Sequence, residues 1–180
     1  MHWKEQLKKL EDAKTWDAAI TLMQDVIERN PADVDAYTRA IYLLHDVLLE
    51  HNYPMDKRPP LQALLTHYFE LSQKMFSDNA EYLFFVGKII YIAEWYFGLD
   101  DDLKPIQEKA AFKMQKKAFE MEKENALFEC TYRFSLHDPR ANELAKQALC
   151  DPKKVEWLES KGYPGEYVLA FLNQITEDAR

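Results

Sequence analysis

Four residues near the end of one predicted helix have side chains of the kinds that bind metal ions: His45, Asp46, Glu50 and His51. Imidazole nitrogens and carboxylate oxygens are common zinc ligands. The spacing is poor, however, because six residues correspond to roughly 600° of helical rotation, which puts His45 and His51 on well-separated faces. The sequence also has no His-Glu-x-x-His motif. We interpret these side chains as solvated or packed and predict no metal site.

Three consecutive aspartates, Asp100 to Asp102, could attract a cation. They lack the spaced oxygen ligands of a calcium-binding loop. An acidic cluster at the start of a helix is the simpler interpretation, because negative charge is favourable at a helix N-terminus.

Cys130 and His137 are of the types that form a nucleophile–base pair. Seven helical residues put them on one face but roughly 10 Å apart. Cys130 and Cys150 both fall in helical patterns without a Cys-x-x-Cys motif, which predicts buried free thiols. A Gly-x-Ser-x-Gly motif is missing, and four scattered glycines do not form a phosphate-binding loop. We predict neither enzymatic activity nor a cofactor.

The elements that must position these side chains are predicted to be helices. Residues 16–31 follow an i, i+3, i+4, i+7 apolar pattern, which indicates a helix with one buried stripe. The stretch 52–60 contains three prolines and must be a loop. Asp138-Pro139 and Asp151-Pro152 each put a capping acid before a proline at the first helical position. The count is about ten helices, and no segment is a convincing strand.

Pro31, at the end of the helix over 16–31, is the first of three equivalent positions. Ser77 and Lys123 follow at intervals of 46 residues, and each position precedes an acidic, amide or small pair and then an aromatic-rich helix. A fixed period of this size predicts stacked helical units. Stacked helix pairs usually form binding surfaces rather than reaction chambers.

The repeated residues resemble the tetratricopeptide repeat, in which two antiparallel helices carry small residues where they cross and a proline ends the second. The positions similar to a second helix are Ala19, Ile20, Val26 and Pro31, then Ala111 and Ala118; those similar to a first helix are Tyr37, Ala40 and Leu44, then Leu83, Val86, Gly87 and Ile90. The family period is about 34 residues. The longer interval here adds residues around 54–60 and 98–104, and Ser77 and Lys123 replace the terminal proline.

This resemblance implies an all-α fold and one domain over residues 1–180. Stacked antiparallel helix pairs, a tetratricopeptide-like α-α superhelix, would extend over 1–136, and a divergent helical cap over 137–180. A generic helical bundle is the alternative.

The resemblance further implies that the first helices line a concave inner face. Aromatic side chains mixed with a few charges on this face suit a protein-binding groove. Internal contacts between adjacent helices are the alternative interpretation. The residues expected there are Asp35, Thr38, Tyr42, His45, Glu81, Phe84, Lys88, Tyr91, Phe134 and His137.

The chain of 180 residues carries a formal net charge of −8. Such a surface repels phosphate backbones, so nucleic acid is not expected as a direct partner. It suits a basic protein partner, although modest acidity also simply maintains solubility. The apolar run over 82–99 is interrupted by Lys88 and Glu94, which argues against a membrane span. No secretory signal is visible at the N-terminus, which predicts a cytoplasmic protein.

The leading hypothesis is a non-catalytic interaction module that binds a protein partner, for example a basic one, on its inner face. A sharper version is an immunity or inhibitor protein that neutralises a toxin, for example a basic nuclease. The alternative of another class is an all-helical enzyme with an unrecognised site, which requires a deep polar pocket with perturbed acids. A monomer is favoured over a self-associating scaffold.

Overall fold

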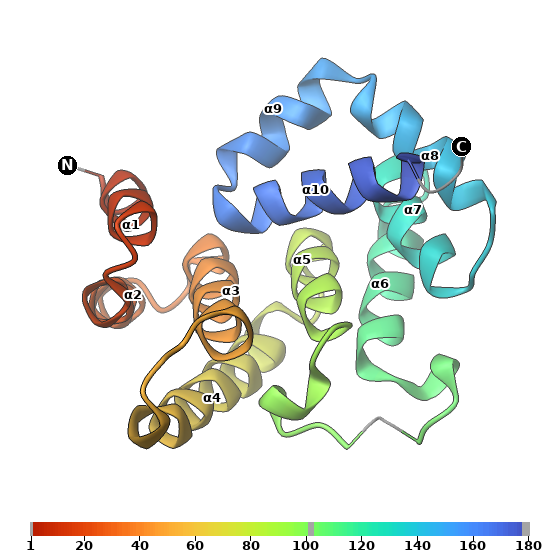
Figure 1. The fold of residues 1–180 in the computed structure, drawn as a ribbon. Coiled ribbons are helices and arrows are strands. Elements are labelled where there is room, and N and C mark those ends of the chain that lie inside the picture. Colours follow the sequence, from red (N-terminus) through yellow and green to blue (C-terminus); the bar gives the residue numbers. More distant parts are fainter. Residues whose placement is uncertain (1, 101–102, 178–180) are drawn as a thin grey trace.

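The computed structural model describes residues 2–100 and 103–177, and these form ten α-helices and three short 3-10 helices without a strand (Figure 1). The all-α class predicted from the sequence is therefore confirmed. In chain order the elements are α1 (Trp3–Asp12), α2 (Trp16–Arg29), α3 (Val34–Glu50), η1 (Met55–Lys57), α4 (Arg58–Phe76), α5 (Ala80–Ile90), η2 (Glu94–Phe97), η3 (Ile106–Glu108), α6 (Ala110–Met121), α7 (Ala126–Ser135), α8 (Arg140–Leu149), α9 (Pro152–Ser160) and α10 (Tyr163–Glu177).

Helices that follow one another in the chain pack as pairs. The pairs are α1 with α2, α3 with α4, α5 with α6, α7 with α8, and α9 with α10. Contacts of α2 with α3, α3 with α5, and α6 with α7 join the first four pairs into a row (Figure 1). The last helix, α10, breaks this order, because it packs on α3 and on α8 as well as on α9.

Three helices of the row begin at equal intervals and by the same device. The residues that cap α3, α5 and α7 are Asp33, Asn79 and Asn125, which are 46 positions apart. Each side-chain oxygen accepts a hydrogen bond from a backbone amide two or three residues later, at 3.0, 2.8 and 3.2 Å respectively. Such a bond satisfies an N–H group that has no partner within the helix. The sequence interval is thus the interval between helix starts.

Helix α5 is shorter than the apolar run from which it is built. The apolar run over 82–99 suggests one continuous helix, but α5 ends at Ile90 and the backbone leaves the helical region at Ala93. The turn that follows directs Phe97 into the core, where its ring centroid lies 5.4 Å from that of Phe69. Gly98 then takes a left-handed conformation at φ 71°. Core packing of Phe97 therefore overrides the helical periodicity of the run.

The centre of the core is α5, where every residue from 82 to 90 is buried. At Gly87 the backbone of α5 lies close to α6. A Cβ atom there would lie 3.0 Å from Cβ of Met114 and 3.3 Å from the carbonyl oxygen of Ala111. The small residue expected at this crossing is therefore present for the expected reason.

Within residues 2–100 and 103–177, no helix has both the length and the apolar character that crossing a membrane requires.

Candidate functional site

The C-terminal helix α10 lies across the side of the row that α3, α5 and α7 share (Figure 1). Its Tyr167 ring is 5.8 Å from that of Tyr42 on α3, and its Phe171 ring is 4.8 Å from that of Phe134 on α7. The preceding helix, α9, adds Trp157, whose ring is 5.5 Å from that of Phe85 on α5. The face expected to be a concave binding surface is therefore largely covered by the chain itself.

The ten residues expected on the inner face differ in exposure accordingly. Five are buried, four are half-buried and one is exposed. In that order they are Asp35, Thr38, His45, Phe84 and Lys88; Tyr42, Glu81, Tyr91 and Phe134; and His137. Internal packing thus accounts for much of this set, and the residues beside an open cavity and the exposed His137 remain as candidates for partner contact.

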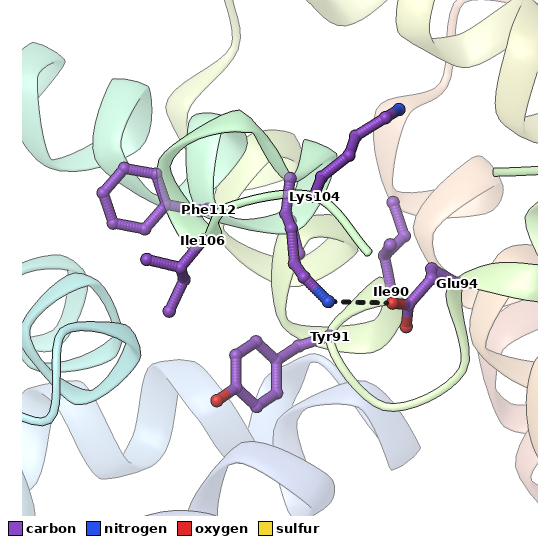
Figure 2. Close-up of a pocket in the computed structure, with 8 residues that line it drawn as sticks. Ile90, Tyr91, Glu94, Lys104, Ile106 and Phe112 are labelled. Atoms are coloured by element: carbon purple, nitrogen blue, oxygen red, sulfur yellow. Dashed lines mark hydrogen bonds and ion pairs between the residues drawn. The ribbon is translucent and has the colours of Figure 1, made fainter. Parts of the chain in front are cut away.

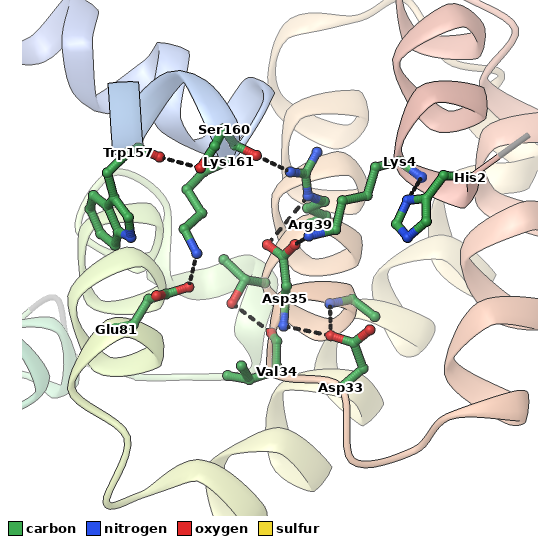
Figure 3. Close-up of polar contacts among 12 residues, drawn as sticks. His2, Lys4, Asp33, Val34, Asp35, Arg39, Glu81, Trp157, Ser160 and Lys161 are labelled. Atoms are coloured by element: carbon green, nitrogen blue, oxygen red, sulfur yellow. Dashed lines mark hydrogen bonds and ion pairs between the residues drawn. The ribbon is translucent and has the colours of Figure 1, made fainter. Parts of the chain in front are cut away.

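Polar contacts attach the α9–α10 turn to the row (Figure 3). The buried guanidinium of Arg39 donates from Nη2 to the carbonyl oxygen of Ser160 at 2.8 Å and from Nε to Asp35 at 3.3 Å. Asp35 also forms an ion pair with Lys4 of α1. Buried charges require partners of this kind, because an isolated charge is costly to desolvate. Asp35 is therefore part of an internal network.

Glu81, another residue expected to bind a partner, has an internal partner as well. Its carboxylate is 2.6 Å from Nζ of Lys161, which follows α9 (Figure 3). The next residue, Gly162, has φ 66°, and a Cβ atom there would lie 2.4 Å from Nη1 of Arg39. Glycine is thus required at this turn for both its conformation and its lack of a side chain.

Lys88 is a buried lysine enclosed by aromatic rings. Its Nζ atom lies 3.5 Å from the ring centroid of Phe171, and 5.2, 5.3 and 5.9 Å from those of Phe134, Tyr91 and Tyr167. Burial lowers the pKa of Lys88 to about 8. Ring faces attract an ammonium group electrostatically, which stabilises its charge in place of a carboxylate. Lys88 therefore contacts α10 through the rings of Phe171 and Tyr167, at the cost of burying its charge.

One part of the inner face stays open, at the C-terminal ends of α3 and α5. A cavity of about 210 Å³ lies there, and we call it the inner cavity. Tyr42 and His45, two of the expected inner-face residues, are in its wall. The residues that line the inner cavity are Tyr42, His45, Asp46, Leu49, Glu50, Ile89, Ile92 and Tyr167.

The charged groups in this lining are both acidic. Asp46 and Glu50 contribute carboxylates, whereas the eight lining residues include no lysine or arginine. Burial raises the pKa of Asp46, while His51, whose Nε2 atom is 3.0 Å from the carboxylate, opposes this shift. The lining itself thus contains two carboxylates and no lysine or arginine, and the ammonium group of Lys88 lies 5.9 Å from the ring centroid of Tyr167.

The histidine of this lining is neutral near pH 7. Burial lowers the pKa of His45 to about 4. Its ring stacks on Phe97 at 5.6 Å, and no described residue forms a hydrogen bond with its Nε2 atom. Burial also raises the pKa values of Tyr42 and Tyr167, so both phenols remain uncharged.

Large apolar side chains are exposed at and beyond the edge of the inner cavity. Ile92 belongs to its lining and is 42% exposed, and Trp95, three residues further along, is 50% exposed. We call these two residues the apolar rim. Exposed tryptophan is unusual in that it combines a large contact area with few rotatable bonds, which favours its use in protein contacts.

Sequence reasoning does not assign several residues to this site: Asp46 and Glu50 are considered only as metal ligands, and Leu49 and Tyr167 are not singled out. Asp46, Leu49 and Glu50 extend the helical stripe that contains Tyr42 and His45, at spacings of three and four residues. That periodicity could have found them. Tyr167 lies 125 positions after Tyr42, and no local signal in the sequence relates the two.

A second cavity, of about 370 Å³, lies between the end of α5, the start of α6 and the loop that joins them (Figure 2). Tyr91 is the expected inner-face residue found in its wall. Nζ of Lys109 is 3.3 Å from the carboxylate of Glu94 at this cavity. The residues that line it are Ile90, Tyr91, Glu94, Lys104, Ile106, Lys109, Ala111 and Phe112. Asp101 and Asp102, from the aspartate run considered as a cation site, lie outside the described residues.

The cysteines and the remaining histidine candidate do not form a catalytic arrangement. Cys130 is buried, donates from Sγ to the carbonyl oxygen of Ala141 at 3.4 Å, and has a pKa raised to about 12 by burial. His137 is exposed at the end of α7. Cys150 is a free thiol as expected, but it is exposed at the end of α8, so the prediction of its burial was wrong. The part of the chain described here contains no group of three or more potential metal ligands.

Comparisons of this chain with protein-family models, curated proteins and solved structures found no match.

Proposed function

We propose that this chain is a non-catalytic protein-binding module, and that its contact surface is the inner cavity together with the apolar rim. The underlying architecture would be a tetratricopeptide-like stack of four helix pairs whose fifth pair covers most of the inner face. The paired packing of consecutive helices and the equal spacing of the caps at Asp33, Asn79 and Asn125 support this architecture.

The observation that carries the proposal is the uneven cover of the inner face. Under α9 and α10, aromatic side chains such as Phe84 are already packed inside the protein. At the end of α3 and α5, by contrast, Ile92 stays exposed in the lining of a cavity, and Trp95, three residues further along the chain, is half exposed. A partner that covered them would remove apolar area from water, which is the main favourable contribution to most protein association.

The lining favours binding over catalysis. Asp46 and His51 form a carboxylate–imidazole pair, but the inner cavity is lined by no serine, threonine or cysteine that such a pair would activate. The acidic lining and the net charge of −8 both favour a partner with a basic contact surface. Complementary charge of this kind speeds encounter and selects among partners.

Site-specific photo-crosslinking in extract from the source cells tests the proposal. A benzoylphenylalanine at position 92 or at position 95 should capture the same protein if the two positions belong to one contact surface, as the proposal requires. The control is the same group at Gln147, an exposed position on α8. Capture of a common protein from 92 and 95 but not from 147 supports the proposal, whereas equal capture from all three or capture from none contradicts it. If the captured protein is a toxin, the role is that of an inhibitor.

A further inference from the structure

We propose that the inner cavity is a socket for the alkylammonium group of a lysine side chain supplied by the partner. This inference rests on the proposed protein-binding function and adds to it the chemistry of the group that is recognised. It is argued from the size of the inner cavity, its charge and its aromatic walls.

The size of the inner cavity favours a single side chain over a cofactor or metabolite. Sites for drug-sized ligands have volumes of roughly 300–1,000 Å³. The inner cavity has about 210 Å³, which is below that range. A lysine side chain is long and slender, and its methylene stem packs along apolar surface while its ammonium group stays near polar atoms. Leu49, Ile89 and Ile92 supply such an apolar surface.

The charge of the lining selects a cation. Asp46 and Glu50 are one helical turn apart on α3. Burial raises the pKa of Asp46, His51 opposes this shift, and the charge of Glu50 adds a smaller contribution that raises it. His51 is the described partner of Asp46, and none of the described residues forms an ion pair with Glu50. An ammonium group between the two carboxylates would relieve their repulsion, and an anion or a neutral group would not.

The aromatic walls add a second attraction for the same group. The rings of Tyr42 and Tyr167 have centroids 5.8 Å apart and an interplanar angle of 48°. Ammonium groups bind to ring faces within about 6 Å. Nζ of Lys88 already lies 5.9 Å from the ring centroid of Tyr167, so the attraction for a further ammonium group comes mainly from Tyr42. Both tyrosines stay neutral because burial raises their pKa values, so the rings act as apolar walls with negative faces.

The neutral state of His45 is consistent with this chemistry. A protonated imidazole in the lining would repel an ammonium group, but burial holds the pKa of His45 at about 4. The full set of titratable side chains in the lining is thus two acids, two phenols and one neutral imidazole.

A titration followed by methyl NMR tests the inference directly. The probe is N-acetyl-lysine methylamide, and the control is N-acetyl-norleucine methylamide, which has the same stem without the ammonium group. The methyl signals of Leu49, Ile89 and Ile92 should shift saturably with the lysine probe, with a dissociation constant on the order of millimolar, as befits one side chain. Binding of the norleucine probe should be about tenfold weaker.

Two double variants decide whether the carboxylates are responsible. Asp46→Asn with Glu50→Gln should abolish the response to the lysine probe. The matched control, Asp25→Asn with Glu28→Gln, makes the same charge change at exposed positions of α2 and should leave the response unchanged. Equal responses to lysine and norleucine, or an unchanged response in the Asp46/Glu50 variant, would overturn the inference. So would much tighter binding of 1,4-diaminobutane, because it would indicate a site for free diamines.

The outcome is separable from that of the proposed function. If crosslinking from position 92 still captures the common partner while the lysine probe does not bind, the protein-binding function stands and the lysine socket is refuted. If the lysine probe binds but positions 92 and 95 capture no common protein, the socket recognises alkylammonium groups and the proposed surface is refuted.

Discussion

The two parts of the inner face are made by the same helices but differ in what lies over them. Around Phe84 and Lys88 the face is covered by Trp157 of α9 and Phe171 of α10. Around the inner cavity, Tyr167 is the lining residue that α10 contributes, and Ile92 is exposed. Side chains of similar type are therefore core in one part and surface in the other. Whether such a side chain is buried or exposed depends on the helices that cover it and not on its position in a repeat-like helix.

Truncation of one apolar side chain in each part should give the largest difference between the covered and the open part. Phe84→Ala, in the covered part, should destabilise the protein by about 3–5 kcal/mol, because it leaves a cavity in a fully buried site. Ile92→Ala, in the open part, should cost less than about 1 kcal/mol. Urea unfolding followed by Trp fluorescence measures both. Comparable losses would show that the two parts are equally buried in solution.

The protonation of His45 provides a test in the open part of the inner face, because this residue lines the inner cavity. Its pKa is about 4 in the folded protein and near 6.5 when unfolded, so between these values the unfolded chain binds more protons. Stability should therefore fall as the pH drops from 6.5 towards 4, by about 2–3 kcal/mol from this group.

The variant His45→Phe keeps a ring against Phe97 but has no proton to bind. Its unfolding free energy should decline less than that of the native chain over the same pH interval. Urea unfolding at pH 7.0 and pH 4.5 measures the difference, and parallel declines would refute the assignment of this effect to His45.

Lys88 provides the corresponding test in the covered part. The pKa of Lys88 is about 8 in the folded protein and 10.5 in the unfolded chain. At neutral pH the folded state therefore bears the cost of a buried charge. Lys88→Met should raise stability at pH 7 by about 1–3 kcal/mol, a range that allows for attraction by the aromatic rings.

The native chain should also gain stability as the pH rises from 8 to 10.5, since the unfolded chain is then the more protonated, and the Met variant should lack this gain. Unfolding free energies at pH 7 and pH 10 check both points. A loss of stability in the variant would show that the cage of rings outweighs the cost of burial.

The smallest expected effect on folding is at the rim. Trp95→Ala should change the unfolding free energy by less than about 1 kcal/mol, because half of this side chain is already in water. The same change should weaken capture of the partner from position 92 strongly, since exposed tryptophans often dominate contacts. Thermal unfolding and crosslinking yield are the two measurements. A large loss of stability together with unchanged capture would reverse the roles assigned here.

The sequence was sufficient to predict the helical class and several helix starts, because these depend on local chemistry. Asp151 caps α9 and Pro152 begins it as predicted, whereas α8 begins at Arg140, one residue after the predicted Pro139. The caps at Asp33, Asn79 and Asn125 and the close approach at Gly87 follow from residue type and spacing. The helical periodicity of α3 also relates Tyr42 and His45, which both line the inner cavity.

The cover over that stripe could not be predicted in the same way. Contacts of α10 with α3 join residues more than one hundred positions apart and depend on how the last pair packs, which no local pattern encodes. The end of α5 at Ile90 was missed for a related reason, since burial of Phe97 decides it.

Thiol labelling tests the uneven cover most directly. In a Cys150→Ser background, a cysteine replaces Ile92 in the open part or the buried Val168 of α10 in the covered part. Native Cys130 is a buried internal reference. The cysteine at 92 should react with a maleimide at the rate of a free thiol. The cysteine at 168 should react only as fast as the protein unfolds. Equal rates at the two positions would contradict the uneven cover of the inner face.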